Sequence, residues 1–244
     1  MHYLIGIDDT DDLTSRGTGF RARCLIETLQ KSGLAFAKRI TRHQLLVDPS
    51  IPYTSHNSAA CLALESGGNG FQQIVDFCRD FLYRESAPGS DTGLCVVPVS
   101  DVNPTITAFG QSAKETVLQR DGALALAREA GIFLQGLTGD HGGVIGALAA
   151  VGLSASGNDG RFIWAQGLRE LDGIHTAEDL LSATGIEVIQ DREGVPVPKN
   201  ARINVEPWPR PVLLRGQAVL LVERSPTSTP YEWQLLPKEI IRRY

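Results

Sequence analysis

Apolar residues in the first hundred positions form short runs typical of strands, separated by longer stretches with helical spacing. The strand-like runs occupy residues 3–7, 35–48, 58–64 and 94–99. Helical spacing marks residues 18–32, which Gly33 closes, and residues 71–82. The order β-α-β-β-α-β is the split βαβ pattern, which predicts a ferredoxin-like unit with an antiparallel sheet and two helices on one face.

The pattern after residue 100 is less regular. Residues 104–130 are helical in character, a glycine-rich turn at 139–143 leads into the small, apolar segment 144–153, and a further helix is expected near 176–183. Five prolines in 195–211 predict an extended excursion, and 212–222 a final strand interrupted at 215–217. The predicted fold is α+β: a ferredoxin-like βαββαβ unit over residues 1–100, carrying an acidic loop, and a second α/β subdomain over residues 101–244.

Composition places the chain among ordinary globular proteins. It has 244 residues, 42% of them hydrophobic, and a net charge of −5. The N-terminal apolar run is too short for a signal peptide and no segment is apolar enough to span a membrane, so we expect a cytoplasmic protein without a membrane partner. The cysteines form no Cys-x-x-Cys pair, which predicts four free thiols: Cys24, Cys61, Cys78 and Cys95.

The strongest candidate for chemistry is the acidic loop that follows the first strand, Gly6-Ile7-Asp8-Asp9-Thr10-Asp11-Asp12. Ionised carboxylates repel one another unless a cation lies among them, and such oxygen ligands suit Mg²⁺ or Ca²⁺. We therefore take Asp8, Asp9 and Asp11 as candidate metal ligands and catalytic residues. The alternative is a turn and helix cap in which these acids face water.

A glycine-rich segment enters the first predicted helix directly after the acidic loop. Backbone N–H groups at such an entry, together with the positive end of the helix dipole, suit phosphate. The candidate nucleotide-binding residues here are Gly17, Thr18, Gly19, Arg21 and Arg23. The alternative is a flexible turn followed by a basic helix whose charges are solvated.

Two further turns contribute candidates. His56 and Asn57 lie in the turn between the two middle strands, which the predicted topology places at the opposite end of the sheet from the acidic loop unless the chain folds back. The turn Asp140-His141-Gly142-Gly143 permits close backbone approach to a nucleotide. The alternatives are an ordinary turn histidine and tight helix packing.

Four segments, in the same order, resemble motifs of the archaeal tRNA-isoleucine 2-agmatinylcytidine synthetase family. They are Ile5-Gly6-Ile7-Asp8-Asp9-Thr10-Asp11, then Asp48-Pro49-Ser50-Ile51-Pro52 with Asn57, then Gly143-Val144-Ile145-Gly146-Ala147-Leu148-Ala149-Ala150-Val151-Gly152, and Pro209-Arg210-Pro211-Val212-Leu213-Leu214 with Arg215-Gly216. The family uses ATP to activate a tRNA cytidine for attack by agmatine, and is built from kinase-like, ferredoxin-like, OB-fold and zinc-ribbon domains. The resemblance implies that Asp8, Asp9 and Asp11 bind Mg²⁺ and ATP, and that the ferredoxin-like part belongs to the other half of the chain.

The chain departs from the family pattern in three places. Anchored on Leu25, the paired threonines of the family, one of them an autophosphorylation site, fall on Ala22 and Arg23. The Lys-Thr-Arg-Gly motif is missing around residues 53–56, and the sequence has no OB-fold or cysteine-ligated ribbon. Anticodon recognition by this chain alone is therefore not expected.

Three functional hypotheses remain. The first is a Mg²⁺-dependent, ATP-using enzyme of nucleotidyl- or phosphoryl-transfer type, kinase-like or ligase-like, related to the synthetases but acting on an unidentified acceptor. The second is a non-catalytic nucleotide- or RNA-binding subunit, with tRNA or a partner subunit completing it. The third is a metal-dependent enzyme for small molecules that uses no nucleotide.

Overall fold

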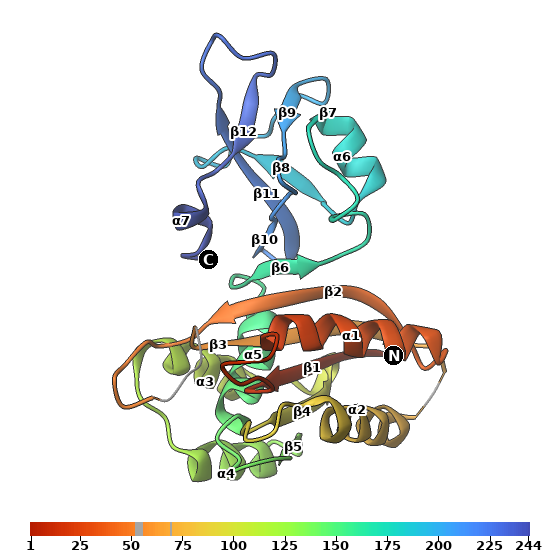
Figure 1. Ribbon diagram of the computed structural model, residues 1–244, viewed down its shortest axis with the longest axis vertical. Coiled ribbons are helices and arrows are strands. Elements are labelled where there is room, and N and C mark those ends of the chain that lie inside the picture. The colour runs from red at the N-terminus through yellow and green to blue at the C-terminus, as the bar shows by residue number, and fades with distance from the viewer. Residues whose placement is uncertain (52–55, 69) are drawn as a thin grey trace. The chain divides into compact units, whose positions relative to one another are not determined.

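The computed structural model describes residues 1–51, 56–68 and 70–244, and the chain divides into two compact units (Figure 1). Unit 1 is Met1–Ser156 and unit 2 is Gly157–Tyr244. The sequence pattern predicts a first domain that ends at residue 100. The division lies further along because the helix at residues 144–156 packs on the sheet formed by the first hundred residues, and the helices at 104–115 and 120–129 pack on that helix.

Unit 1 is built on a five-stranded antiparallel sheet in the order β5-β4-β1-β3-β2. Its strands are β1 (His2–Asp8), β2 (Ala35–Gln44), β3 (Ser58–Ser66), β4 (Gly93–Pro98) and β5 (Phe133–Gly136). Helices α1 (Thr18–Lys31) and α2 (Phe71–Glu85) connect β1 to β2 and β3 to β4. The predicted β-α-β-β-α-β order is therefore present, and the strand order β4-β1-β3-β2 is the one in which each of these helices crosses over one strand.

The two faces of this sheet carry different layers, which can be followed along β1. Successive side chains of a strand point to opposite faces. Tyr3 packs on Phe71 of α2, with ring centroids 6.1 Å apart, whereas its neighbour Leu4 belongs to the buried cluster that includes α5 (Val144–Ser156). Helices α1 and α2 therefore cover one face and α5 the other.

Helix α5 is the centre of the second layer. It contacts β1, β3 and β4, and α3 (Pro104–Glu115) and α4 (Arg120–Glu129) pack on it in turn. Its close approach requires glycine: a Cβ on Gly6 would lie 1.9 Å from the carbonyl oxygen of Ala147, and one on Gly152 would lie 2.1 Å from that of Ile106. Because α5 is enclosed on all sides, nearly every side chain in it is small or apolar.

Unit 2 contains seven strands and two short helices. These are β6 (Arg161–Trp164), β7 (Ile174–Thr176), α6 (Ala177–Ala183), β8 (Val188–Gln190), β9 (Arg202–Asn204), β10 (Val212–Leu214), β11 (Gln217–Arg224), β12 (Trp233–Leu235) and α7 (Lys238–Ile241). Its own core lies around Phe162, Leu180, Ile203 and Leu220.

The structure differs from the predicted elements in several places: β5 and α7 fall where no element is predicted, and the strand predicted for 35–48 ends at residue 44. The helical stretch at 104–130 is two helices, the proline-rich excursion contains β9, and the interrupted strand at 212–222 is a hairpin. Leu214 faces Gln217 across a two-residue turn in which Arg215 and Gly216 have φ of 51° and 77°, values that close an antiparallel pair. The α+β class is confirmed.

Among the described residues, no helix combines the length and apolar composition needed to cross a bilayer. All four cysteines are free, and Cys61, Cys78 and Cys95 are buried in unit 1.

Candidate functional site: an acidic loop against a glycine-rich turn

Strand register brings the predicted turns to one end of the unit 1 sheet. Ile7, at the end of β1, faces Ala60 at the start of β3, and Asp8 faces Gly93 at the start of β4. Gly93 in turn faces Gly136 at the end of β5, just before the glycine-rich turn. The acidic loop, the β2–β3 turn and residues 137–143 therefore share one edge.

This corrects the predicted position of the β2–β3 turn, which was placed at the opposite end of the sheet. Because β1 and β3 are antiparallel neighbours, the end of β1 lies beside the beginning of β3, where that turn enters. Asn57 has a structural role there: its side-chain Nδ2 donates to the carbonyl oxygen of Leu46, 2.6 Å away. His56 is exposed in the same turn, and residues 52–55 lie outside the described part of the chain.

Asp8 lies against the first turn of α5. A Cβ on Gly146 would fall 1.8 Å from the Asp8 Oδ2 atom, so glycine is required for this carboxylate to sit where it does. Burial, followed by the nearby charges of Asp9 and Asp11, raises the pKa of Asp8 to about 8, although Arg42 acts in the opposite direction.

Asp9 is held in an unusual backbone conformation, with φ of 51°. Burial and then the charges of Asp91, Asp11 and Asp140 raise its pKa to about 6. Asp8 and Asp9 thus form a pair of carboxyl groups with too little positive charge around them.

The other two acids of the loop hold structure. Oδ1 of Asp11 accepts from both the N–H and the hydroxyl of Thr18, at 2.9 and 2.8 Å, at the start of α1. Asp12 Oδ1 accepts from the N–H groups of Thr14 and Ser15, each at 2.8 Å. These hydrogen bonds keep the pKa of Asp12 below its usual value. Asp11 and Asp12 therefore hold the turn and the start of α1 through their hydrogen bonds, whereas Asp8 and Asp9 are the two acids of the loop with raised pKa.

The basic residues are largely engaged elsewhere. Arg21 pairs with Glu85 of α2 at 2.8 Å, and Arg23 donates to the carbonyl oxygen of Gly19 at 3.0 Å. Gly17 is the N-terminal cap of α1, with φ of −58°, a conformation open to any residue. In this structure Arg21 joins α1 to α2 and Arg23 bonds within α1, and the side chain of Arg21 is only 14% exposed.

The backbone N–H groups of the glycine-rich turn donate both within the turn and to a neighbouring segment. The N–H of Gly142 donates to Oδ1 of Asp140 at 2.8 Å, and the N–H of Gly143 donates to the carbonyl oxygen of Asp91 at 2.8 Å. A Cβ on Gly143 would lie 2.5 Å from that oxygen. His141, which is exposed, has φ of 69°. The glycines thus permit close packing of this turn on its neighbours.

Sequence reasoning missed the segment that joins these two loops. Residues 87–92, which we call the strap, follow α2 and lead into β4. Asp91 Oδ1 accepts from the N–H of Asp140 at 2.7 Å, and the hydroxyl of Thr92 donates to the carbonyl oxygen of Asp9 at 3.1 Å. In the sequence, Pro88-Gly89-Ser90 indicates only a turn. The signal that could have pointed to the strap is the run of three polar residues Ser90-Asp91-Thr92.

The donor set of the acidic loop fits a small cation that takes only part of its ligands from protein. Within the part of the chain that the structure describes, no group of three or more His, Cys, Asp or Glu residues is arranged to hold a metal ion. Mg²⁺ needs no such group, because it commonly binds through one or two carboxylates together with water and phosphate oxygens. The unbalanced charge at Asp8 and Asp9 suits that coordination.

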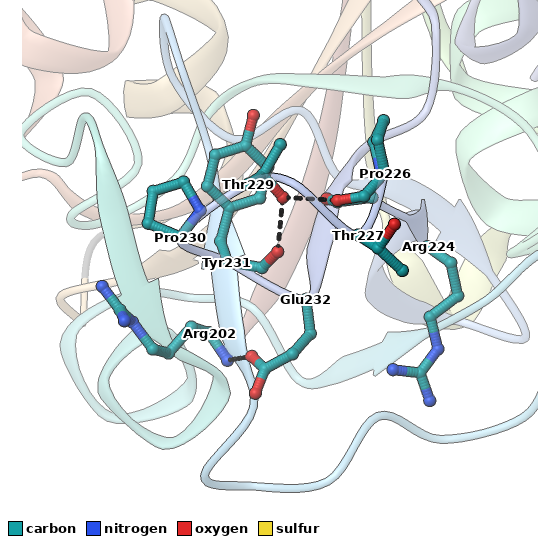
Figure 2. Close-up of a pocket in the computed structure, with 9 residues that line it drawn as sticks. Arg202, Arg224, Pro226, Thr227, Thr229, Pro230, Tyr231 and Glu232 are labelled. Atoms are coloured by element: carbon teal, nitrogen blue, oxygen red, sulfur yellow. Dashed lines mark hydrogen bonds between the residues drawn. The ribbon is translucent and has the colours of Figure 1, made fainter.

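A separate cavity of about 550 Å³ lies in unit 2, beside the loop between β11 and β12 (Figure 2). Arg202, Arg224, Tyr231 and Glu232 line it, and Glu232 accepts a hydrogen bond from the backbone N–H of Arg202. The guanidinium of Arg224 stacks on Trp233, 4.1 Å from the ring centroid. No residue singled out by sequence lines this cavity.

Comparison with solved structures finds similarity over part of the chain. A tRNA fluorescent labeling enzyme is 28% identical with a TM-score of 0.55, over 62% of this chain and 36% of that one. The complex of TiaS, a tRNA agmatidine synthetase, with tRNA and ATP is 27% identical, TM-score 0.55, with the same coverage. The TiaS complex with tRNA, AMPCPP and agmatine is 26% identical, TM-score 0.54, again over 62% and 36%.

No protein-family model and no curated protein matches the chain. The chain therefore shares a TiaS-like fold over 62% of its length and spans about a third of the length of those structures.

Proposed function

We propose that unit 1 binds ATP with Mg²⁺ at the acidic loop and transfers a phosphoryl or nucleotidyl group to an acceptor. The observation that carries this proposal is the position of Asp8 and Asp9, two carboxyl groups of raised pKa at the edge where the acidic loop, the strap and the glycine-rich turn meet. The likeness to TiaS, which has been solved in complex with ATP, supports it.

The residues of the chain would divide the work as follows. Asp8 and Asp9 would hold Mg²⁺, whose charge offsets that of the phosphates and of the group being transferred. Asp11 would act through α1, whose first N–H it accepts. The first turn of α5 lies beside Asp8, so the positive end of its helix dipole would also face the negative charge of the phosphates.

The substitution Asp8→Asn tests this assignment. We would titrate ATP, with and without Mg²⁺, and follow the unfolding temperature of the wild type, Asp8→Asn and Asp80→Asn. Asp80, on α2, is the matched control because its side chain is 67% exposed and makes only a long contact of 3.7 Å to Arg79. Ligand at a hundredfold excess over its Kd stabilises the folded state by about 2.7 kcal/mol.

We expect a Mg²⁺-dependent shift of several degrees in the wild type and in Asp80→Asn, and none in Asp8→Asn. A shift of equal size in Asp8→Asn would place the nucleotide elsewhere. No shift in any of the three proteins would leave the metal-dependent enzyme without a nucleotide as the better hypothesis.

The likeness to TiaS, which has been solved in complex with tRNA and ATP, favours a second candidate function. At 36% of their length, the chain matches too little of them to carry over their whole activity. The candidate is a nucleotide- or RNA-binding subunit that does not turn ATP over by itself. ATP binding without release of ADP, AMP or phosphate in the isolated protein would support this candidate against the first.

A further inference from the structure

The strap, residues 87–92, is hydrogen-bonded to the acidic loop on one side. The N–H of Ala87 donates to the carbonyl oxygen of Thr10 at 3.0 Å. Five residues later, the side-chain hydroxyl of Thr92 donates to the carbonyl oxygen of Asp9 at 3.1 Å. Two consecutive carbonyl groups of the acidic loop are therefore fixed by the strap.

On its other side the strap is bonded to the segment that contains the glycine-rich turn. The N–H of Thr92 donates to Oγ1 of Thr138 at 2.9 Å, and the N–H of Leu137 donates to the carbonyl oxygen of Thr92 at 2.7 Å. The carboxylate and carbonyl oxygens of Asp91 accept from Asp140 and Gly143. Thr92 thus bonds to the acidic loop and to the glycine-rich segment at the same time.

The hydroxyl groups of Ser90, Thr92 and Thr138 form a cluster, in which Oγ of Ser90 lies 3.1 Å from Oγ1 of Thr92 and 3.3 Å from Oγ1 of Thr138. The hydroxyl of Thr92 has one proton and donates it to the carbonyl oxygen of Asp9. In the 3.1 Å contact between the hydroxyls of Ser90 and Thr92, Ser90 is therefore the donor. The hydroxyl of Thr138 donates to the carbonyl oxygen of Ser90, 2.6 Å away. Thr138 therefore binds the backbone of Ser90, and the side chain of Ser90 binds the hydroxyl of Thr92, which donates to the backbone of Asp9.

The last acceptor of these hydrogen bonds, Asp9, has the unfavourable backbone conformation of the acidic loop. Asp9 has φ of 51°, in the left-handed region that residues with a Cβ adopt only at a cost in free energy. Thr92 is fully buried, so its hydroxyl and the Asp9 carbonyl form their hydrogen bond away from water, where an unmade bond is costly. The bond therefore favours the backbone conformation that sets the direction of the Asp9 carboxylate.

We propose that Thr92 is a positioning residue, whose hydroxyl fixes Asp9 for cation and nucleotide binding and couples the acidic loop to the glycine-rich turn. The ligand class is a nucleoside triphosphate with a divalent cation, so the binding part of this proposal rests on the proposed function. The coupling part is a property of the protein without ligand. The two parts therefore have separate measurements.

The test compares Thr92→Val, which keeps the shape of the side chain and removes its hydroxyl, with Thr92→Ser, which keeps the hydroxyl. Thr28→Val is the matched control, because it deletes a hydroxyl that donates to the carbonyl oxygen of Cys24, 2.7 Å away within α1. Thr138→Val is the second variant, which decides the question if Thr92→Val does not fold. It removes the hydroxyl that donates to the carbonyl oxygen of Ser90 and accepts from the N–H of Thr92.

The first measurement is amide hydrogen exchange of each folded protein without ligand. We expect residues 9–12 and 139–143 to exchange faster together in Thr92→Val and in Thr138→Val, and at the wild-type rate in Thr92→Ser and Thr28→Val. Faster exchange confined to one of the two segments would overturn the coupling.

The second measurement is the Mg²⁺ concentration that gives half of the ATP-dependent shift in unfolding temperature. We expect it to rise about five-fold in Thr92→Val, the effect of losing one hydrogen bond, and to stay at the wild-type value in Thr92→Ser. An unchanged Mg²⁺ requirement in Thr92→Val, with only its ligand-free unfolding temperature lowered, would overturn the positioning role. A wild type that shows no shift would instead contradict the proposed function and, with it, the binding part, leaving hydrogen exchange to decide the coupling.

Discussion

At Asp8 and Asp9, the charges that suit a cation oppose folding when no cation is bound. A carboxyl group with a pKa raised in the folded chain binds protons more tightly when folded than when unfolded. Its contribution to stability is therefore fully present below the unfolded pKa, near 4, and is lost as pH rises to the folded value. That value is about 6 for Asp9 and about 8 for Asp8.

The first prediction follows from this sign. In the presence of a chelator, the free energy of unfolding should fall as pH rises from 5 to 8, and Asp8→Asn should be more stable than the wild type at pH 8. Unfolding temperatures measured by calorimetry at both pH values test this. The same decline with pH in Asp8→Asn as in the wild type would contradict the assignment of the raised pKa to Asp8.

The second prediction concerns Gly146, whose missing side chain makes room for Asp8. An added Cβ would lie 1.8 Å from Oδ2 and 2.5 Å from Cγ of Asp8, so Gly146→Ala should displace the carboxylate. We expect the Mg²⁺-dependent ATP shift to be lost. Gly122→Ala is the control: nothing lies within 4 Å of its added Cβ, and its ATP shift should match the wild type. Retention of the shift in Gly146→Ala would show that the position of Asp8 does not matter for binding.

At the scale of elements, the packing of α5 depends on glycines that face backbone rather than side chains. The third prediction is that Gly152→Ala destabilises unit 1 by about 1–3 kcal/mol, because its Cβ would lie 2.1 Å from the carbonyl oxygen of Ile106 in α3, and backbone cannot turn aside. Gly122→Ala should instead stabilise α4 by about 0.5–1 kcal/mol. Urea titrations of both variants give the two values, and equal stabilities would contradict this account of the α3–α5 contact.

The elements of the first hundred residues could be predicted because their signals are local. In α2, for example, Ile74, Val75, Cys78, Phe81 and Leu82 recur at helical spacing and are all buried. In α1 the apolar spacing of Phe20, Cys24, Leu25 and Leu29 predicts the buried face only in part. Leu25 and Leu29 are buried, Phe20 and Cys24 are partly buried, and the small residue Ala22 also packs inward. Small residues carry little hydrophobic signal, so a face that approaches its neighbour closely is easily missed.

The candidate site was predictable in its residues and not in its arrangement. Asp8 and Asp9 stand out because crowded acids are unusual at the end of a strand. The strap does not stand out, since Ser90, Asp91 and Thr92 are common turn residues. Their role arises from contacts with residues more than forty positions away, such as the hydrogen bonds from Thr138 to Ser90 and from Thr92 to Asp9.

At the scale of the whole molecule, every residue of the candidate site belongs to unit 1. The fourth prediction is that the fragment of residues 1–156, which has its own core, folds cooperatively and keeps the Mg²⁺-dependent ATP shift. Circular dichroism melts of the fragment with and without ATP provide the measurement. A fragment that folds and yet binds no ATP would show that unit 2 supplies part of the binding energy.

All four cysteines lie in unit 1, so their reaction with a thiol reagent reports transient unfolding of that unit. Burial raises the pKa of Cys61 to about 11 and that of Cys78 and Cys95 further still, so none of the three forms the thiolate that attacks an alkylating reagent at neutral pH. Cys24 is only partly covered, and unit 2 holds no cysteine. Iodoacetamide should therefore modify Cys24 first, and the three buried cysteines only when unit 1 transiently unfolds. The rate at which mass spectrometry detects the second and later modifications then measures the unfolding of unit 1 alone.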